Sequence, residues 1–198
     1  MSGLVVPGLP ASLRPVNDPV AEPLADGLRL SAPGQTDWFV DPAGEVTIGN
    51  APALIMRADG DWMLRARVSA THEATFDAAV LVVHADEDTW AKLCLERSPG
   101  GQVLVVSVVT RGTSDDCNSV PVDGDEIWFR VSRLGHAFAF HTSADGAHWD
   151  MVRYFGLGVS GSVEVGFLAQ SPTGGGCAAT FRDIAFEDGR LPELRSGV

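Results

Sequence analysis

Short alternating or apolar segments, each closed by a turn signal, follow one another along most of the chain. Residues 63–69 alternate strictly between small or aliphatic side chains and longer or charged ones, as in a strand with one buried face. Residues 77–84 and 103–111 are apolar on both faces, which is typical of central strands. Turns containing Gly, Pro or Asp recur about every ten residues, and no long stretch keeps the roughly 3.6-residue period of a helix. The pattern predicts an all-β sandwich of roughly ten to twelve strands, without the βαβ alternation of parallel sheets.

The two ends of the chain differ from this pattern. Residues 1–27 carry five prolines, which break helices and cannot donate to a sheet. We expect this segment to be an extended arm over the surface rather than an element of the core. Three aliphatic residues in it can dock the arm: Leu9, Leu13 and Val16. The sandwich is predicted to span residues 28–188, with residues 189–198 as a C-terminal tail.

The charge of the chain narrows the range of partners. Asp and Glu number 26 against 14 Lys and Arg, for a formal net charge of −12. A phosphate backbone binds a field of positive charge, so this balance argues against nucleic acid, and the same repulsion disfavours anionic membrane surfaces. No apolar run approaches the roughly 18 residues of a membrane span. We therefore expect neither nucleic acid nor a membrane as a partner.

The cysteines and the N-terminal residues bear on the compartment. Cys94, Cys117 and Cys177 are an odd set without a Cys-x-x-Cys pair, whereas small secreted domains favour even disulfide frameworks. Residues 1–10 lack the basic start of a signal peptide, and prolines interrupt their apolar residues. These features predict a reduced, cytoplasmic protein.

One stretch, residues 88–97, combines a core face with a chemically rich face. Side chains alternate along a strand, so Ala91, Leu93 and Leu95 point together into the predicted core. The opposite face carries an aromatic ring, a cation, a thiol and a carboxylate, from Trp90, Lys92, Cys94 and Glu96. Because a polar ligand can use such a row, we predict that this face looks outward into a groove.

Five local patterns occur in the order found in a known family. They are Thr36-Asp37-Trp38-Phe39, the apolar run 77–82, the row 90–96, the segment 108–115 and Ser143-Ala144-Asp145-Gly146-Ala147-His148-Trp149. Over about residues 28–187 this series resembles the concanavalin A-like family that includes the regulation-of-enolase proteins. The resemblance implies a jelly-roll sandwich of two antiparallel sheets with a concave face. That family typically has a tryptophan after its Ser-Asp pair, where this chain has Asp116 and Cys117, so the ligand class need not carry over.

Glu96 is the candidate catalytic residue, as a general acid or base. The alternative is a salt bridge along the strand with Lys92. Retaining glycosidases place two carboxyl groups about 5 Å apart, but the same-face neighbours of Glu96 are a cysteine and a serine. A second carboxylate would have to come from another strand, with Asp77 and Asp115 the best placed.

Further binding candidates come from other predicted strands. Trp38 and Trp90 can stack on a sugar ring, although tryptophan is also a large core residue. Arg130 can clamp a carboxylate or phosphate, or instead pair across strands with Glu96 or Asp115. His141 titrates near neutrality but is equally explained as a hydrogen-bonded structural residue. The predicted ligand-binding set is Trp38, Asp77, Trp90, Lys92, Glu96, Thr110, Asp115, Arg130 and His141.

No metal or cofactor is predicted. Residues 115–125 are acidic, and calcium prefers several such oxygens, but the ordered calcium-loop pattern is missing, which favours a solvated acidic loop. The cysteines and histidines show no zinc spacing, and the glycine run 174–176 lacks the lysine and helix of a phosphate-binding loop.

Our leading functional hypothesis is a non-catalytic module that binds a carbohydrate or similar polar small molecule on the concave sheet. Trp90, Lys92, Glu96 and Arg130 would line its groove. The first alternative is an enzyme, an isomerase, lyase or cyclase and less readily a glycoside hydrolase, that uses Glu96 as acid or base. The second is an interaction module that regulates another enzyme. The doubly apolar strands fit either a covered groove or a homodimer contact.

Overall fold

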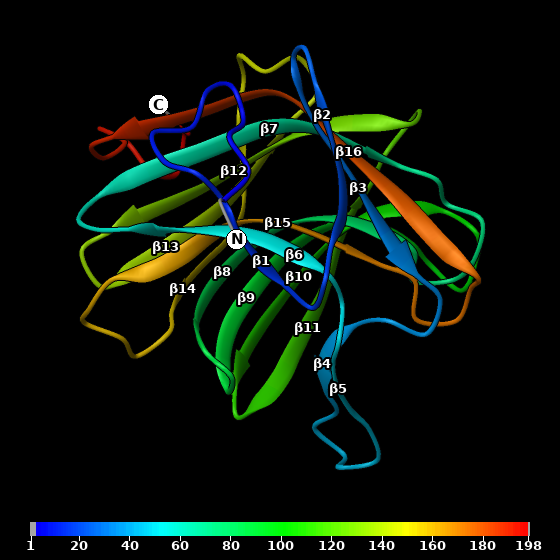
Figure 1. The fold of residues 1–198 in the computed structure, drawn as a ribbon. Helices are drawn as coiled ribbons and strands as arrows, with labels where there is room; N and C mark the ends of the chain where they lie inside the picture. The colour runs from blue at the N-terminus through cyan, green and yellow to red at the C-terminus, as the bar shows by residue number, and fades with distance from the viewer. Residues whose placement is uncertain (1–2, 198) are drawn as a thin grey trace.

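Two antiparallel sheets of seven strands each, with a separate two-stranded ribbon, make up the fold (Figure 1). The computed structural model describes residues 3–197. In spatial order the first sheet comprises β1 (Arg14–Val16), β6 (Ala53–Ala58), β15 (Val163–Gln170), β8 (Ala78–Asp86), β9 (Thr89–Arg97), β10 (Val103–Arg111) and β11 (Thr113–Pro121). The second comprises β14 (Asp150–Gly156), β13 (Ala137–Ser143), β12 (Glu126–Leu134), β7 (Trp62–Ala70), β16 (Gly176–Asp188), β3 (Gly27–Pro33) and β2 (Val20–Leu24). The ribbon pairs β4 (Trp38–Val40) with β5 (Thr47–Gly49), and the predicted all-β class is confirmed.

The core lies between the two sheets and follows the alternation seen in the sequence. On β9, Ala91, Leu93 and Leu95 are fully buried in the layer between the sheets. Across that layer, Phe167 of β15 meets Phe181 of β16 with ring centroids 4.8 Å apart. Burying each such ring stabilises the fold by about 2–3 kcal/mol. The predicted division of residues 88–97 into a core face and an outer face is confirmed.

Several strands of the structure are not expected from the sequence pattern, and β11 is the most polar of them. The loop expected at residues 115–125 is instead largely β11, an edge strand whose side chains are nearly all exposed. Such a strand has one solvated edge and needs no apolar alternation, so its acidic sequence is compatible with pairing to β10. β6 and β14 are likewise absent from the sequence prediction.

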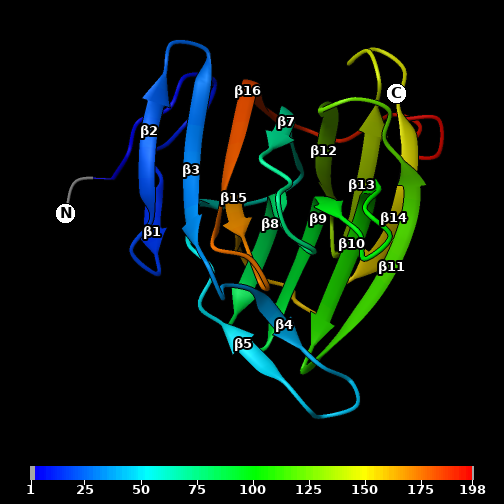
Figure 2. The same cartoon turned by 90° about the vertical axis from the view of Figure 1, so that its right-hand side faces the viewer.

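The N-terminal segment takes part in both sheets, so the expectation of an arm outside the core is wrong. β1 pairs with β6 in the first sheet and β2 pairs with β3 in the second. Both strands lie at sheet edges (Figure 2), where the missing N–H of a proline interrupts no continuous ladder. Leu13 just before β1 is fully buried in the inter-sheet core.

The β4–β5 ribbon lies across part of the outer face of the first sheet (Figure 2). Trp38 Nε1 donates to the carbonyl oxygen of Ala51 at 3.0 Å, and the Val40 amide donates to Ser114 Oγ at 3.0 Å. The second bond ties the ribbon to β11. The ribbon and β11 therefore meet at Ser114, and residues from both line the exposed part of this sheet face.

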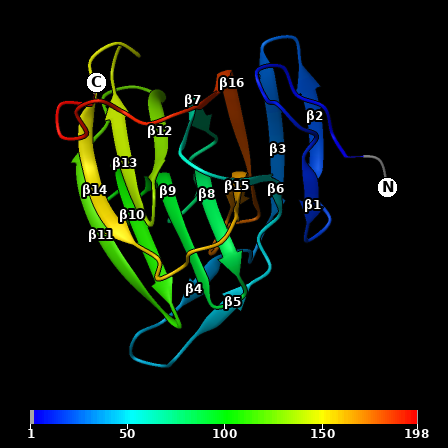
Figure 3. The ribbon, with the colours of Figure 1, turned by 90° about the vertical axis from the view of Figure 1, so that its left-hand side faces the viewer.

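The C-terminal segment 189–197 packs against the second sheet, near β12, β13 and β14 (Figure 3). Arg130 donates to the carbonyl oxygen of Gly197 at 2.6 Å, and His141 Nε2 lies 2.8 Å from the carbonyl oxygen of Leu194. Leu191, within this segment, is itself buried. The predicted tail is thus a packed part of the domain.

The three cysteines are free thiols, with Cys94 and Cys177 buried and Cys117 exposed. Within residues 3–197, no helix has the length and hydropathy needed to cross a bilayer.

Candidate functional site

The outer face of the first sheet carries a small polar cluster in an otherwise apolar surface. Strand pairing places Lys92 between Val82 of β8 and Val108 of β10. Glu96 and Gln170 fall in one cross-strand row, on β9 and β15 with β8 between them. Their long side chains stand out from the sheet on the same side, so their polar ends converge.

Lys92 is 2% exposed, yet its charge is fully compensated. Its Nζ lies 2.8 Å from Asp37 Oδ1 and 2.8 Å from Gln170 Oε1. Burial alone would lower the pKa of Lys92, but the charge and hydrogen bond of Asp37, with further contributions from Cys94 and Glu96, together outweigh burial and the pKa is raised. The ammonium therefore stays protonated and fixed, which makes it a positioning charge rather than a nucleophile.

Gln170 connects Lys92 to Glu96. Its Nε2 donates to Glu96 Oε2 at 3.3 Å and to the carbonyl oxygen of Phe76 at 3.2 Å. Burial raises the pKa of Glu96 to about 8; Lys92 opposes this shift and Asp37 adds to it. At neutral pH this side chain is mostly a neutral carboxylic acid, which can donate a hydrogen bond as well as accept one.

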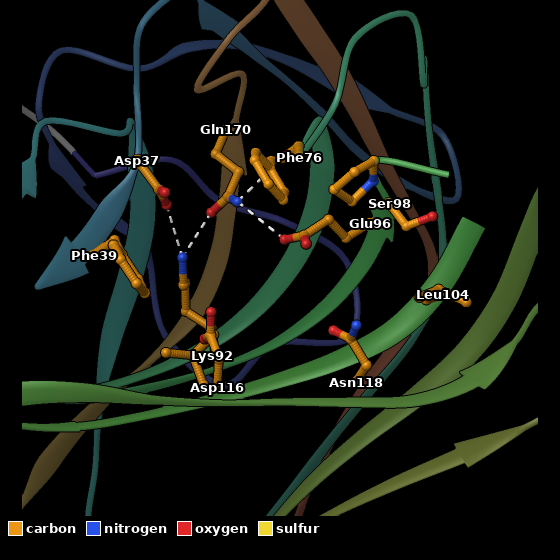
Figure 4. A pocket seen from close by; sticks show the side chains of 12 residues that line it. Asp37, Phe39, Phe76, Lys92, Glu96, Ser98, Leu104, Asp116, Asn118 and Gln170 are labelled. Atoms are coloured by element: carbon orange, nitrogen blue, oxygen red, sulfur yellow. Dashed lines mark hydrogen bonds and ion pairs between the residues drawn. The ribbon is translucent and has the colours of Figure 1, made fainter. Parts of the chain in front are cut away.

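A pocket of about 500 Å³, here called the Lys92–Glu96 pocket, opens over this cluster (Figure 4). Its size falls within the range of about 300–1,000 Å³ usual for small-molecule sites. Its lining residues are Asp37, Phe39, Phe76, Lys92, Glu96, Ser98, Pro99, Leu104, Val108, Asp116, Asn118 and Gln170. The pocket thus combines aromatic and aliphatic walls with a charged and amide-bearing floor, which is the usual composition of a site for a polar ring.

Phe76 at the rim of the pocket has an unusual backbone. Its φ of 68° lies in the left-handed region, which costs a bulky residue roughly 1 kcal/mol or more. Its amide donates to the carbonyl oxygen of Arg97 at 2.7 Å, which holds this conformation. The ring is 37% exposed, an exposure that leaves its surface available to a bound molecule.

The edge strand β11 supplies another part of the pocket wall. Asp116 pairs with Val108 in the sheet register and Asn118 with Val106, so both side chains lie on the outer face. Partial burial raises the pKa of Asp116; Lys92 opposes this and Asp37 reinforces it. Neither residue is in the predicted set, because the interpretation of their segment as a loop gives no alternation that would separate Asp116 from Asp115, the residue that was chosen.

Within residues 3–197, no uncompensated positive charge lines the pocket. Lys92 is the one basic residue of this lining and is paired with Asp37, while Glu96 is mostly protonated at neutral pH. The remaining acidic group is Asp116. An electrostatic environment of this kind suits neutral ligands better than anions.

Trp38, Trp90 and Thr110 reach the same sheet face but do not line the Lys92–Glu96 pocket. The two indole rings pack edge to face at 6.0 Å and are at most 5% exposed. They contribute instead to a neighbouring pocket of about 340 Å³ beside the β4–β5 ribbon. Thr110 is fully buried, 2.9 Å from Ser114 Oγ. The expectation that Trp90 lines the same groove as Lys92 and Glu96 is therefore wrong.

Asp77 is fully buried, and its carboxylate accepts hydrogen bonds that hold the neighbouring backbone. Its carboxylate accepts from Ser171 Oγ at 2.7 Å and from the amides of Glu73 and Ala74. These bonds fix the loop that carries Phe76, so Asp77 supports the pocket from below without reaching it.

Asp115 points away from the pocket. Its carboxylate pairs with Arg153 of β14 at 3.1 Å, and its neighbour Asp116 faces the ligand side instead. Neither Asp77 nor Asp115 is the second carboxylate at Glu96. Asp116 is the only other acid besides Asp37 among the described residues that line the pocket.

Arg130 and His141 belong to the second sheet, on β12 and β13, and they face away from the core. The prediction that Arg130 lines the groove with Glu96 is wrong, as is its alternative pairing with Glu96 or Asp115. Alternation along a strand tells which residues share a face but not which sheet the strand joins. Both residues lie beneath the C-terminal segment.

Sequence reasoning missed Asp37, Gln170 and Phe76 as site residues. Asp37 stands in the Thr-Asp-Trp-Phe pattern that carries the family resemblance, beside the tryptophan that was chosen. Gln170 is the one amide at the end of an apolar strand, a local signal for a functional position. Within residues 3–197, no three His, Cys, Asp or Glu side chains gather in a way that could hold a metal ion.

Known proteins of similar sequence or structure share this architecture. The chain is 26% identical over 160 residues to Regulation of enolase protein 1 of Saccharomyces cerevisiae (strain ATCC 204508 / S288c), a match that covers 80% of each protein. A solved structure of a functionally unknown Saccharomyces cerevisiae protein superposes with a TM-score of 0.84 at 24% identity, covering 90% of this chain and 97% of that one. The carbohydrate binding module CBM66 of Bacillus subtilis gives a TM-score of 0.58 at 11% identity, covering 87% and 93%.

These likenesses confirm the predicted concanavalin A-like jelly-roll sandwich and the resemblance to the family that includes the regulation-of-enolase proteins. The family model described as "Protein of unknown function (DUF1349)" matches residues 16–189, which is most of the chain. The protein therefore belongs to the DUF1349 family.

Proposed function

We propose that this protein is a binding module that holds a neutral carbohydrate, or a similar uncharged polar molecule, in the Lys92–Glu96 pocket. The observation that carries the proposal is the chain of contacts from Asp37 through Lys92 and Gln170 to Glu96 on the floor of a pocket of about 500 Å³. Fixed polar groups beneath apolar walls orient a small polar ligand.

The lining matches the chemistry of a sugar ring. Hydroxyl groups both donate and accept, and the pocket offers a donor at protonated Glu96, an acceptor at Asp116 and both at the amide of Asn118. Phe39 and Phe76 provide aromatic surface for the apolar face of the ring. The lack of an unpaired positive charge among the described lining residues argues against sugar phosphates and uronic acids.

The fold likeness gives coarser support. CBM66 of Bacillus subtilis is a carbohydrate binding module, and its sandwich is similar to this one. That similarity makes a sugar-binding use of the sandwich reasonable, while the choice of ligand rests on the pocket itself.

Calorimetric titration with a panel of neutral, acidic and amino sugars tests the proposal. Neutral sugars should bind with millimolar or better affinity, and acidic sugars of the same ring should bind more weakly. Lys92→Met should abolish binding, and Arg57→Gln is the matched control because Arg57 is an exposed residue of the same sheet paired with Asp59. Failure of every neutral sugar to bind at tens of millimolar would remove the proposal.

A second candidate is catalysis by Glu96. With a pKa of about 8 this acid can give up and retake a proton near neutrality, and Asp116 is a second titratable group on the same pocket. An isomerase, lyase or cyclase acting on a polar metabolite is the class that this pair fits best. Glu96→Gln separates the two functions, because an enzyme would lose turnover yet keep binding, whereas a binding module has no turnover to lose.

A third candidate comes from a relative. The printed name Regulation of enolase protein 1 supports an interaction module that acts on another enzyme, with exposed Phe76 and Val120 as contact residues. Sedimentation of a mixture with purified enolase tests it, and Phe76→Ser should weaken any complex. Sedimentation of the chain alone tests the proposed homodimer.

A further inference from the structure

The outer face of the second sheet holds a row of two arginines and a histidine with unused hydrogen-bonding atoms. Arg65 of β7, Arg130 of β12 and His141 of β13 are direct cross-strand neighbours. Arg65 Nε, Arg130 Nε and His141 Nδ1 are all buried without a hydrogen-bond partner, as is the hydroxyl of nearby Ser132. Buried polar groups are nearly always paired in native proteins, so a group of them in one place indicates a site for a polar ligand.

Arg130 is the centre of this group. It is 6% exposed, its guanidinium lies 4.3 Å from the ring centroid of Trp149, and it donates to the Gly197 carbonyl at 2.6 Å. Burial, with the charge of Arg65 added, lowers the pKa of Arg130 to about 10, which still leaves it charged at neutral pH. Among the described residues, no carboxylate lies within ion-pair distance of it.

A pocket of about 360 Å³ opens beside Arg130. Its lining residues are Met63, Arg65, Arg130, Ala147, Trp149, Ala185, Glu187, Leu191 and Gly197. Glu187 pairs with Arg65 at 3.5 Å and partly compensates its charge. The charge of Arg130 is not compensated by an ion pair with any carboxylate among the described residues. The C-terminal segment forms one wall, which means that the pocket exists with this segment in its packed position.

We propose that the Arg65–Arg130 pocket binds a small oxyanion, a carboxylate or phosphate group, held by the two guanidinium groups. A guanidinium presents its N–H groups in a planar fork that matches the oxygens of such anions, and a bound anion would relieve the repulsion between Arg65 and Arg130. Trp149 fixes the plane of Arg130, so the fork is already oriented.

This site is independent of the proposed function. It lies on the opposite side of the sandwich from the Lys92–Glu96 pocket and selects anions rather than neutral molecules. The protein would then carry two ligand sites of different chemistry, a neutral one and an anionic one.

Arginine Nε–Hε resonances in a nuclear magnetic resonance titration test the site directly. Sodium phosphate and sodium acetate are added separately to the full chain, with sodium chloride balancing the ionic strength. The Arg130 resonance should shift saturably at millimolar phosphate or acetate, and the Arg57 resonance should not. Saturation by phosphate alone, acetate alone or both supports the site and identifies its anion.

Two variants complete the test. Arg65→Gln should weaken anion affinity by about tenfold, as expected for the loss of a charge-assisted contact. Arg65 is partly exposed, so this variant should keep the fold even if Arg130→Gln does not. Arg57→Gln should leave the affinity unchanged. The absence of a saturable Arg130 shift with either anion, or an equal affinity in Arg65→Gln, would overturn the proposal.

Discussion

Lys92 Nζ lies 2.8 Å from Asp37 Oδ1, and this ion pair joins the middle of β9 to the start of the β4–β5 ribbon across 55 residues of chain. The pair serves two purposes at once. It neutralises a lysine that the sheet buries, and it holds the ribbon in the position where Phe39 forms a wall of the pocket.

Asp37→Ala should destabilise the protein by about 3 kcal/mol or more, because it leaves the buried Lys92 ammonium without its carboxylate. Urea unfolding followed by tryptophan fluorescence measures the loss. The control is Asp59→Ala, which removes the partner of exposed Arg57 and should change stability little. An equal effect of the two substitutions would show that Lys92 does not depend on Asp37.

Glu96 should make the folded state less stable as the pH rises. Its pKa is about 8 in the folded protein against 4.5 as the ordinary value, so between these limits the folded state keeps a proton that the unfolded state has lost. Its stabilising contribution is complete below about pH 4.5 and disappears as the pH rises through 8, by at most about 1.4 kcal/mol per pH unit. Glu96→Gln removes this dependence. The stability difference between variant and wild type, measured by urea unfolding, should therefore change in favour of the variant from pH 5 to pH 8; a constant difference would contradict the shifted pKa.

Asn118→Ala should reduce affinity for a neutral sugar by about tenfold, since it removes one ligand hydrogen-bond partner from an exposed wall. Stability should hardly change, because the residue is exposed on an edge strand. Ser119→Ala alters a neighbouring exposed residue that does not line the pocket and serves as the control. Titration calorimetry distinguishes the two variants.

Gly197→Ala should release the C-terminal segment from the second sheet. A Cβ at this position would lie 2.5 Å from Trp149 Cβ and 2.8 Å from its carbonyl oxygen. Hydrogen exchange at residues 191–197 and the fluorescence of Trp149 should both report the release. Gly158→Ala is a close control, because Gly158 shares the φ of 74° but has open space around it. If residues 191–197 are equally protected from hydrogen exchange in both variants, the packing of the segment does not depend on the close approach of Gly197 to Trp149.

Alternation along strands made half of this site predictable. Lys92 and Glu96 are on the outward face that their even spacing implies, and the aliphatic residues between them are in the core, because one period governs both faces of a strand. The central strands β8 and β10 are predictable for the same reason.

The remaining residues depend on which strands become neighbours, and local pattern does not contain that information. Arg130 has the alternation of an outward residue but belongs to the other sheet. Asp37 reaches Lys92 only because the ribbon folds over the face. Asp116 lies on β11, whose sequence shows no alternation of apolar and polar residues. This segment becomes a strand through its pairing with β10 rather than through its own sequence.

β9 supplies core residues from one face and pocket residues from the other, and this double role restricts how the pocket can change during evolution. A slip of one residue in its pairing would turn Lys92 and Glu96 inward and their aliphatic neighbours out to solvent. Insertions and deletions in this strand should therefore be eliminated during evolution, and new ligand preferences should arise by replacement at even-numbered positions or by remodelling of the ribbon and the β11 edge.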